Sequence, residues 1–192
     1  FYNYVRPHIS KALEYLNATN DGRTWISNLN FHVFCEEHRA ILSEEGMSLL
    51  QTISKKMAEE SNFDNALHFI LNNICDFQKW PVGHAYCRTK DANEYKMSPT
   101  NVWHIHKRTE AIDNFVAVTS SMDFATGIGL PGRVLESGKA AWIEDVTADP
   151  NFPRAQLARD IGVKGAFAFP IKDADGVSYV LEFYSLDVEQ PE

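Results

Sequence analysis

Residues 127–170 read GIGLPGRVLESGKAAWIEDVTADPNFPRAQLARDIGVKGAFAFP, a stretch in which turn-forming residues separate short regular segments. The opening glycines and Pro131 predict a tight turn that leads into a one-turn helix. A strand at residues 140–144, a second short helix at 153–159 and a strand at 165–172 follow. A chain with this order of elements wraps a small pocket against one face of an antiparallel sheet.

Two more strands are predicted upstream. Residues 82–88 alternate between small side chains on one face and the large side chains of His84 and Tyr86 on the other. The small face allows a helix to approach closely, and the large face is available to line a cavity. A polar loop is expected at 89–100, and the next strand at 101–107.

The chain closes with a hairpin. Residues 165–172 and 177–185 are predicted strands, joined through the strong turn signal Asp173-Ala174-Asp175-Gly176. Because the strands come in hairpins and not in alternating βαβ units, an antiparallel sheet and an α+β fold are expected. Several strands are apolar on both faces, so helices should cover both sides of the sheet.

Helices are predicted before the sheet. Residues 36–57 carry one apolar stripe at helical spacing, which fits a helix packed on the domain and equally a parallel two-chain coiled coil. A second helix is expected after the capping residues Ser61-Asn62, ending near Pro81. A third is expected at 109–121.

The expected organisation has three parts. Residues 1–34 form an N-terminal helical or linker segment, and residues 35–60 form a signalling or linker helix. Residues 61–192 form the folded domain, whose first helix can also lie within 45–60. The chain begins without an initiating Met and ends on Gln-Pro-Glu, so we expect it to be part of a longer protein.

Composition limits the class of function. The formal net charge is −8, with 26 acidic against 18 basic residues, which disfavours nucleic-acid binding. The three cysteines (Cys35, Cys75 and Cys87) are widely spaced and form no C-x-x-C pair, which fits a reducing cytoplasm better than a disulfide framework or a zinc site. No apolar run is long enough to span a membrane, so this segment is expected to make no membrane contact.

Residues 127–132 spell G-x-G-x-x-G, the fingerprint of dinucleotide-binding proteins. Such a site needs a strand immediately before the motif and a crossover helix after it. Here the preceding residues 120–126 are polar, and only a short helix fits before Gly138. The glycines are therefore interpreted as structural, permitting a tight turn.

Several segments resemble the GAF domains common in bacterial histidine kinases and diguanylate cyclases. The segments are WPVGHAY, NVWHI, TEAIDNF, GIGLPGRVLESGKAAWIEDVTADPNFPRA, GAFAFPI and VLEFYS, and they span about three quarters of the chain, residues 46–185. The resemblance implies a six-stranded antiparallel GAF/PAS-like sheet with helices on both faces. It also implies a cytoplasmic sensory module of a two-component or cyclic-dinucleotide signalling protein, without catalytic activity of its own.

The resemblance raises the question of a cofactor. Bilin-binding relatives carry a linking cysteine near the pocket helix, and residues 153–159 contain none, so a covalent bilin is not expected. The N-K-x-n-F-x-x-x-D-E signature of cyclic-nucleotide binders is absent. Haem bound through His84, His104 or His106 is a weaker alternative, because strand histidines more often have ordinary packing roles. No cofactor and no metal site are therefore expected, and the ligand is an unidentified small molecule.

Candidate ligand contacts are the cationic and large side chains near the expected pocket. Arg154 lies near a helix start, where backbone amides favour anions, and Arg133 lies beside the Pro131 turn. Either arginine could hold a polar or anionic ligand, or pair with Asp145, Asp149 or Glu136 to fasten loops. The complete predicted set is His84, Tyr86, Trp103, Arg133, Trp142, Arg154 and Phe167.

The expected mechanism is a shift in population. A ligand changes packing between the 36–57 helix and the sheet, and a homodimer formed through the N-terminal helices passes the change to an output domain in the same protein. The alternative is a ligand-free dimerisation or scaffold domain whose cavity is filled by its own aromatic side chains.

Overall fold

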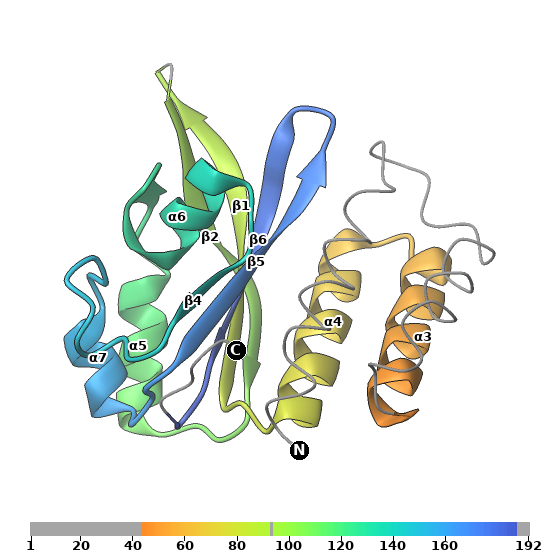
Figure 1. Cartoon of the computed structure of the whole chain (residues 1–192), viewed down its shortest axis with the longest axis horizontal. Helices are drawn as coiled ribbons and strands as arrows, with labels where there is room; N and C mark the ends of the chain where they lie inside the picture. The colour runs from red at the N-terminus through yellow and green to blue at the C-terminus, as the bar shows by residue number, and fades with distance from the viewer. Residues whose placement is uncertain (1–43, 93, 188–192) are drawn as a thin grey trace.

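A computed structural model describes residues 44–92 and 94–187. The expected N-terminal segment 1–34 and the first part of the predicted 36–57 helix lie outside the described residues. The described part is layered (Figure 1): one central sheet has α4 on one face and α5, α6 and α7 on the other, and α3 flanks α4.

The six strands form one sheet in the order β3-β2-β1-β6-β5-β4, and every neighbouring pair is antiparallel. The predicted α+β class and antiparallel sheet are therefore confirmed. The strands are β1 (Val82–Asp91), β2 (Glu94–Ile105), β3 (Phe124–Ala125), β4 (Ala141–Ile143), β5 (Ala166–Asp173) and β6 (Gly176–Tyr184).

The first hairpin is longer than predicted. The prediction of a polar loop at residues 89–100 is wrong, because β1 and β2 remain paired as far as Asp91 and Glu94. The polar side chains in this segment bond across the two strands, as in the 2.6 Å hydrogen bond between the hydroxyls of Thr89 and Ser98. Alternation also continues on the buried side, where Met97 is fully covered.

Two helices precede the sheet, α3 (Glu44–Glu59) and α4 (Phe63–Gln78). The side chain of Asn62 accepts a hydrogen bond from the Asn65 amide, which confirms the predicted cap of α4. The close approach predicted from the small residues of β1 is also present. A Cβ added at Gly83 would lie 2.9 Å from Cys75 Sγ on α4, so only glycine fits here without a shift.

On the other face lie α5 (Glu110–Thr119), α6 (Gly129–Ser137) and α7 (Ala155–Asp160). The predicted one-turn helix at Pro131 is longer than expected: α6 begins two residues earlier and runs to its left-handed cap at Gly138. A Cβ at Gly132 would lie 2.2 Å from the carbonyl oxygen of Ala125. Gly127 and Gly129 have positive φ angles of 80° and 63°, which fits the tight turn that was predicted. Gly132 also allows close packing of α6 on β3, which was not predicted.

Alternation along the strands separates two hydrophobic clusters. In β5, Phe167 and Phe169 belong to the cluster beneath α4, whereas Ala166 and Ala168 belong to the cluster beneath α6 and α7. The small side chain of Ala168 lies beside Glu182 on the second face, where Arg154 reaches the sheet.

Candidate functional site

Glu182 lies at the centre of the sheet face that α5, α6 and α7 cover. Its partners in the ladder are His84 on β1 and Ala168 on β5. Tyr184 follows two residues later on the same face of β6, and Tyr86 follows His84 on the same face of β1. A carboxylate is thereby placed in an apolar interior, where an unpaired charge is costly.

Arg154 supplies the opposite charge from the start of α7. Its Nη2 donates to Glu182 Oε1 at 2.7 Å and its Nη1 donates to Oε2 at 3.1 Å, a bidentate pair with both side chains fully buried. Tyr86 Oη accepts from Arg154 Nη1 at 2.9 Å and donates to Glu182 Oε2 at 3.1 Å. We call Arg154, Glu182, Tyr86, Tyr184 and His84 the polar cluster.

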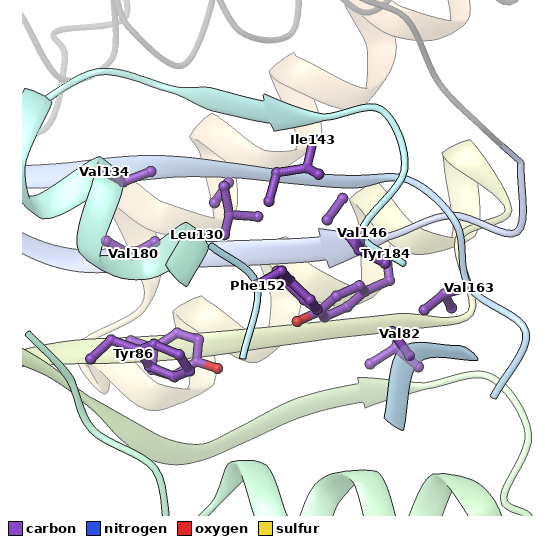
Figure 2. Packing of buried hydrophobic residues seen from close by; sticks show 14 of the residues in the cluster. Val82, Tyr86, Leu130, Val134, Ile143, Val146, Phe152, Val163, Val180 and Tyr184 are labelled. Carbon is purple, nitrogen blue, oxygen red and sulfur yellow. The ribbon is translucent and has the colours of Figure 1, made fainter. Parts of the chain in front are cut away.

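Aromatic rings surround the guanidinium of Arg154. Phe124 and Phe152 lie closest, with ring centroids 4.8 Å and 5.1 Å from Cζ. The rings of Phe115, Tyr184 and Tyr86 complete the shell at 5.8–6.0 Å. In Figure 2 the hydroxyls of Tyr86 and Tyr184 point toward one another beside Phe152. Such a shell excludes water and strengthens each electrostatic interaction inside it.

Three buried polar atoms of the polar cluster make no hydrogen bond of good geometry: Arg154 Nε, Tyr184 Oη and His84 Nδ1. The Tyr184 hydroxyl interacts with the Glu182 carboxylate, but outside hydrogen-bond geometry. A buried polar group without a partner costs about 1–3 kcal/mol. Most buried polar groups in folded proteins are paired, so three unpaired atoms in one cluster make this cluster the candidate functional site.

Burial sets the charge state of the cluster. It lowers the pKa of His84 to about 3, so the imidazole is neutral at pH 7. It raises the pKa of Tyr86 and of Tyr184 well above the usual range of a phenol. Burial alone lowers the pKa of Arg154, but the Glu182 carboxylate together with Tyr184 and Tyr86 outweighs burial, and the pKa is raised. The cluster therefore holds one cation and one anion.

The structure brings four of the seven predicted site residues together. His84, Tyr86 and Arg154 belong to the polar cluster, and Trp103 stacks on His84 with ring centroids 3.6 Å apart. Arg154 lies just before α7 and not in its first turn as predicted. It pairs with Glu182, which was not among the three predicted partners.

The other three predicted residues lie elsewhere. Arg133 forms a bidentate pair with Asp149 at 2.8 Å and 2.6 Å, so the interpretation that it fastens loops is the one observed. Trp142 and Phe167 stack on each other in the cluster beneath α4, on the opposite face from Arg154. Period-two alternation from Ala166 places Phe167 on that face.

Sequence reasoning missed Glu182 and Tyr184. The signal was present in the run VLEFYS, where one carboxylate stands between apolar residues of a strand buried on both faces. A charge at such a position requires a buried partner of opposite sign. Arg154, already singled out, was the partner to seek.

His104, one of the histidines considered for haem, contacts α4. His104 Nδ1 donates to Asn72 Oδ1 at 2.8 Å, an ordinary packing role. Within residues 44–92 and 94–187, no group of three or more His, Cys, Asp or Glu side chains is arranged to hold a metal ion. In the same residues no helix combines the length and apolarity that crossing a bilayer requires.

A sequence model of the NLP protein GAF domain matches residues 58–190. The chain belongs to this GAF domain family. The match covers the whole sheet and the polar cluster, and it confirms the predicted GAF fold. The family is typically a small-molecule-binding regulatory or sensory module. No curated protein sequence matches the chain.

Solved structures share the fold at low sequence identity. The GAF domain of a phosphoenolpyruvate-protein phosphotransferase from Coxiella burnetii is 15% identical with a TM-score of 0.58, covering 77% of this chain and 82% of that one. The A. aeolicus nlh2 GAF domain is 14% identical with a TM-score of 0.55, covering 73% and 79%. Free methionine-R-sulfoxide reductase from Neisseria meningitidis is 15% identical with a TM-score of 0.56, covering 74% of each chain. These likenesses concern the fold alone.

Proposed function

We propose that this GAF domain is the sensory module of a longer cytoplasmic signalling protein and binds a small molecule at the polar cluster. The observation that carries the proposal is the set of three polar atoms without a hydrogen bond of good geometry, buried around one ion pair. A ligand that satisfies them recovers a desolvation cost already incurred in folding. The polar cluster lies on the sheet face covered by α6 and α7, which belong to the segment 127–170 where the pocket is expected.

Strand β6 offers a route from the cluster to the helices on the far face. Glu182 faces Arg154, and its neighbours Leu181 and Phe183 pack in the cluster beneath α4 together with Leu49 and Ile53 of α3. A ligand that moves Arg154 or Glu182 would therefore change packing beneath the N-terminal helices. We propose that this shift in population passes through a homodimer of those helices to an output domain.

The class of the output domain remains a prediction. The resemblance of the segments pointed to a histidine kinase or a diguanylate cyclase, whereas the matching family model is that of NLP proteins. The full-length gene decides between these parents, because each output domain carries its own sequence motifs.

We propose that the domain itself is not an enzyme. Burial raises the pKa of both described thiols, Cys75 and Cys87, so neither is a ready nucleophile at pH 7. Assay of the purified chain for methionine sulfoxide reduction tests this directly, and turnover would overturn it.

A ligand-free scaffold is the second candidate. It is favoured by the ion pair itself, since Arg154, Glu182 and Tyr86 satisfy most of one another's hydrogen bonds. In that case the polar cluster is a structural core and nothing enters it.

One experiment separates the two candidates. The purified chain is analysed by native mass spectrometry for a copurified ligand, and by thermal shift against a broad metabolite library. We expect at least one compound to raise Tm in the wild type and in Arg133→Gln, but not in the double variant Arg154→Met/Glu182→Leu. No compound raising Tm would favour the scaffold, and a Soret band would redirect the assignment to haem.

A further inference from the structure

We infer that the polar cluster binds an uncharged ligand through a carboxamide or lactam group. The inference rests on the proposed function and narrows the class of ligand. It combines the charge balance of the cluster, the donors and acceptor that it leaves open, and the flat aromatic walls around Arg154.

The charge balance of the polar cluster disfavours a charged ligand. The Arg154 guanidinium is already neutralised by the bidentate Glu182 carboxylate, and both are fully buried. A bound anion would lie beside the Glu182 carboxylate, and a bound cation beside the guanidinium, without a free counter-charge in the cluster. Adding a third buried charge carries a desolvation cost that a neutral ligand avoids.

The polar cluster leaves both hydrogen-bond donors and a hydrogen-bond acceptor unused. Arg154 Nε always carries a proton, so it is an unused donor. The Tyr184 hydroxyl is a second donor: it interacts with the Glu182 carboxylate but lies outside hydrogen-bond geometry, so it can donate to a ligand. His84 supplies an acceptor: its Nε2 lies 3.0 Å from the Thr100 carbonyl, which can only accept, so the proton is on Nε2. In the neutral ring Nδ1 is then an unprotonated acceptor without a partner.

An amide matches this set. Its carbonyl oxygen has two lone pairs and accepts from both Arg154 Nε and Tyr184 Oη, and its N–H donates to His84 Nδ1. A carboxylate of the same shape has no N–H to give, and an ammonium group has no acceptor. The rings of Phe124 and Phe152 beside the guanidinium favour a planar group with a small apolar remainder.

The test uses isosteric probes on the full chain at pH 7. Isobutyramide and 2-pyrrolidinone are the neutral probes, and isobutyrate is the charged isostere. Binding is followed by Tm and by backbone amide shifts in a titration. We expect saturable shifts at His84 and Tyr184 with the amides and none with isobutyrate.

The matched variants are Tyr184→Phe and Tyr179→Phe. Tyr184→Phe removes only a hydroxyl that lies outside hydrogen-bond geometry and keeps the ring, so the fold should survive. It is expected to weaken amide binding about threefold to tenfold. Tyr179→Phe changes a half-buried ring that packs against Phe63 beneath α4, and should bind as the wild type does.

Two outcomes overturn the inference. Equal binding of isobutyrate, or amide binding that Tyr184→Phe leaves unchanged, would show that the cluster does not select a neutral amide. A charged metabolite that shifts His84 and Tyr184 while the amides do not would refute the inference but leave the proposed function standing. If neither amides nor any library compound shifts these residues, both fail.

Discussion

Arg154 and Glu182 are joined by a fully buried ion pair, with 2.7 Å between Nη2 and Oε1, that ties α7 to the centre of the sheet. Removing one partner leaves an uncompensated buried charge. We therefore expect Arg154→Met and Glu182→Leu each to lower the free energy of unfolding by about 3–5 kcal/mol. The double variant should lie within about 2 kcal/mol of the wild type, because both charges are gone. Urea unfolding measures all three, and losses that simply add would refute the account of the pair.

Gly132 is expected to tolerate no side chain. Its Cβ would lie 2.2 Å from the Ala125 carbonyl oxygen, which is backbone and cannot rotate away. Gly132→Ala should lower the free energy of unfolding by about 3 kcal/mol. The control is Gly162→Ala, where φ is +77° and nothing lies within 4 Å, so backbone strain of about 1 kcal/mol is the only cost. Equal losses in thermal or urea unfolding would contradict the packing argument.

Gly83 and Cys75 are expected to be coupled. Gly83→Ala pushes a methyl group to 2.9 Å from Cys75 Sγ and should cost about 1–3 kcal/mol. Cys75→Ala removes the sulfur, so the double variant should be more stable than the sum of the single losses predicts. A double-mutant cycle by urea unfolding measures the coupling. Additive losses would mean that the helix and strand do not touch here.

Stability is expected to fall in mild acid because of His84. In the unfolded chain an imidazole takes up a proton near pH 6.5, whereas burial lowers the pKa of folded His84 to about 3. Between these values the unfolded state binds more protons, so the free energy of unfolding decreases as the pH falls through the window. The loss should reach about 2 kcal/mol between pH 6.5 and pH 4.5.

The control for this pH dependence is His84→Gln. In this variant the free energy of unfolding should depend less steeply on pH. A part of the pH dependence should remain because burial also lowers the pKa of His104. A slope identical to that of the wild type would show that His84 is not buried in its neutral form.

The sequence predicts the elements better than the site. Asn62, Pro81 and the 173–176 turn mark their boundaries by local chemistry, and each boundary is confirmed. The two-residue strand β3 was not predicted, because its pairing with Lys96 and Met97 depends on tertiary contact and not on a local pattern.

The candidate site also depends on tertiary contacts that a local sequence pattern does not predict. Arg154 was found because a lone cation near a pocket helix is conspicuous, but its partner lies 28 residues away on a central strand. Trp142 and Phe167 were chosen for size. The face on which a strand residue lies depends on register, which the sequence of one strand does not specify until its neighbours are placed.

The most direct test of the polar cluster as a ligand site is the Nε–H resonance of Arg154 in ¹⁵N-correlated spectra, followed while a stabilising compound is added. The account predicts that this resonance shifts saturably with the change in Tm, and that the Nε–H of Arg133, held outside the cluster by Asp149, stays in place. A compound that stabilises the chain while the Arg154 resonance does not move would contradict it.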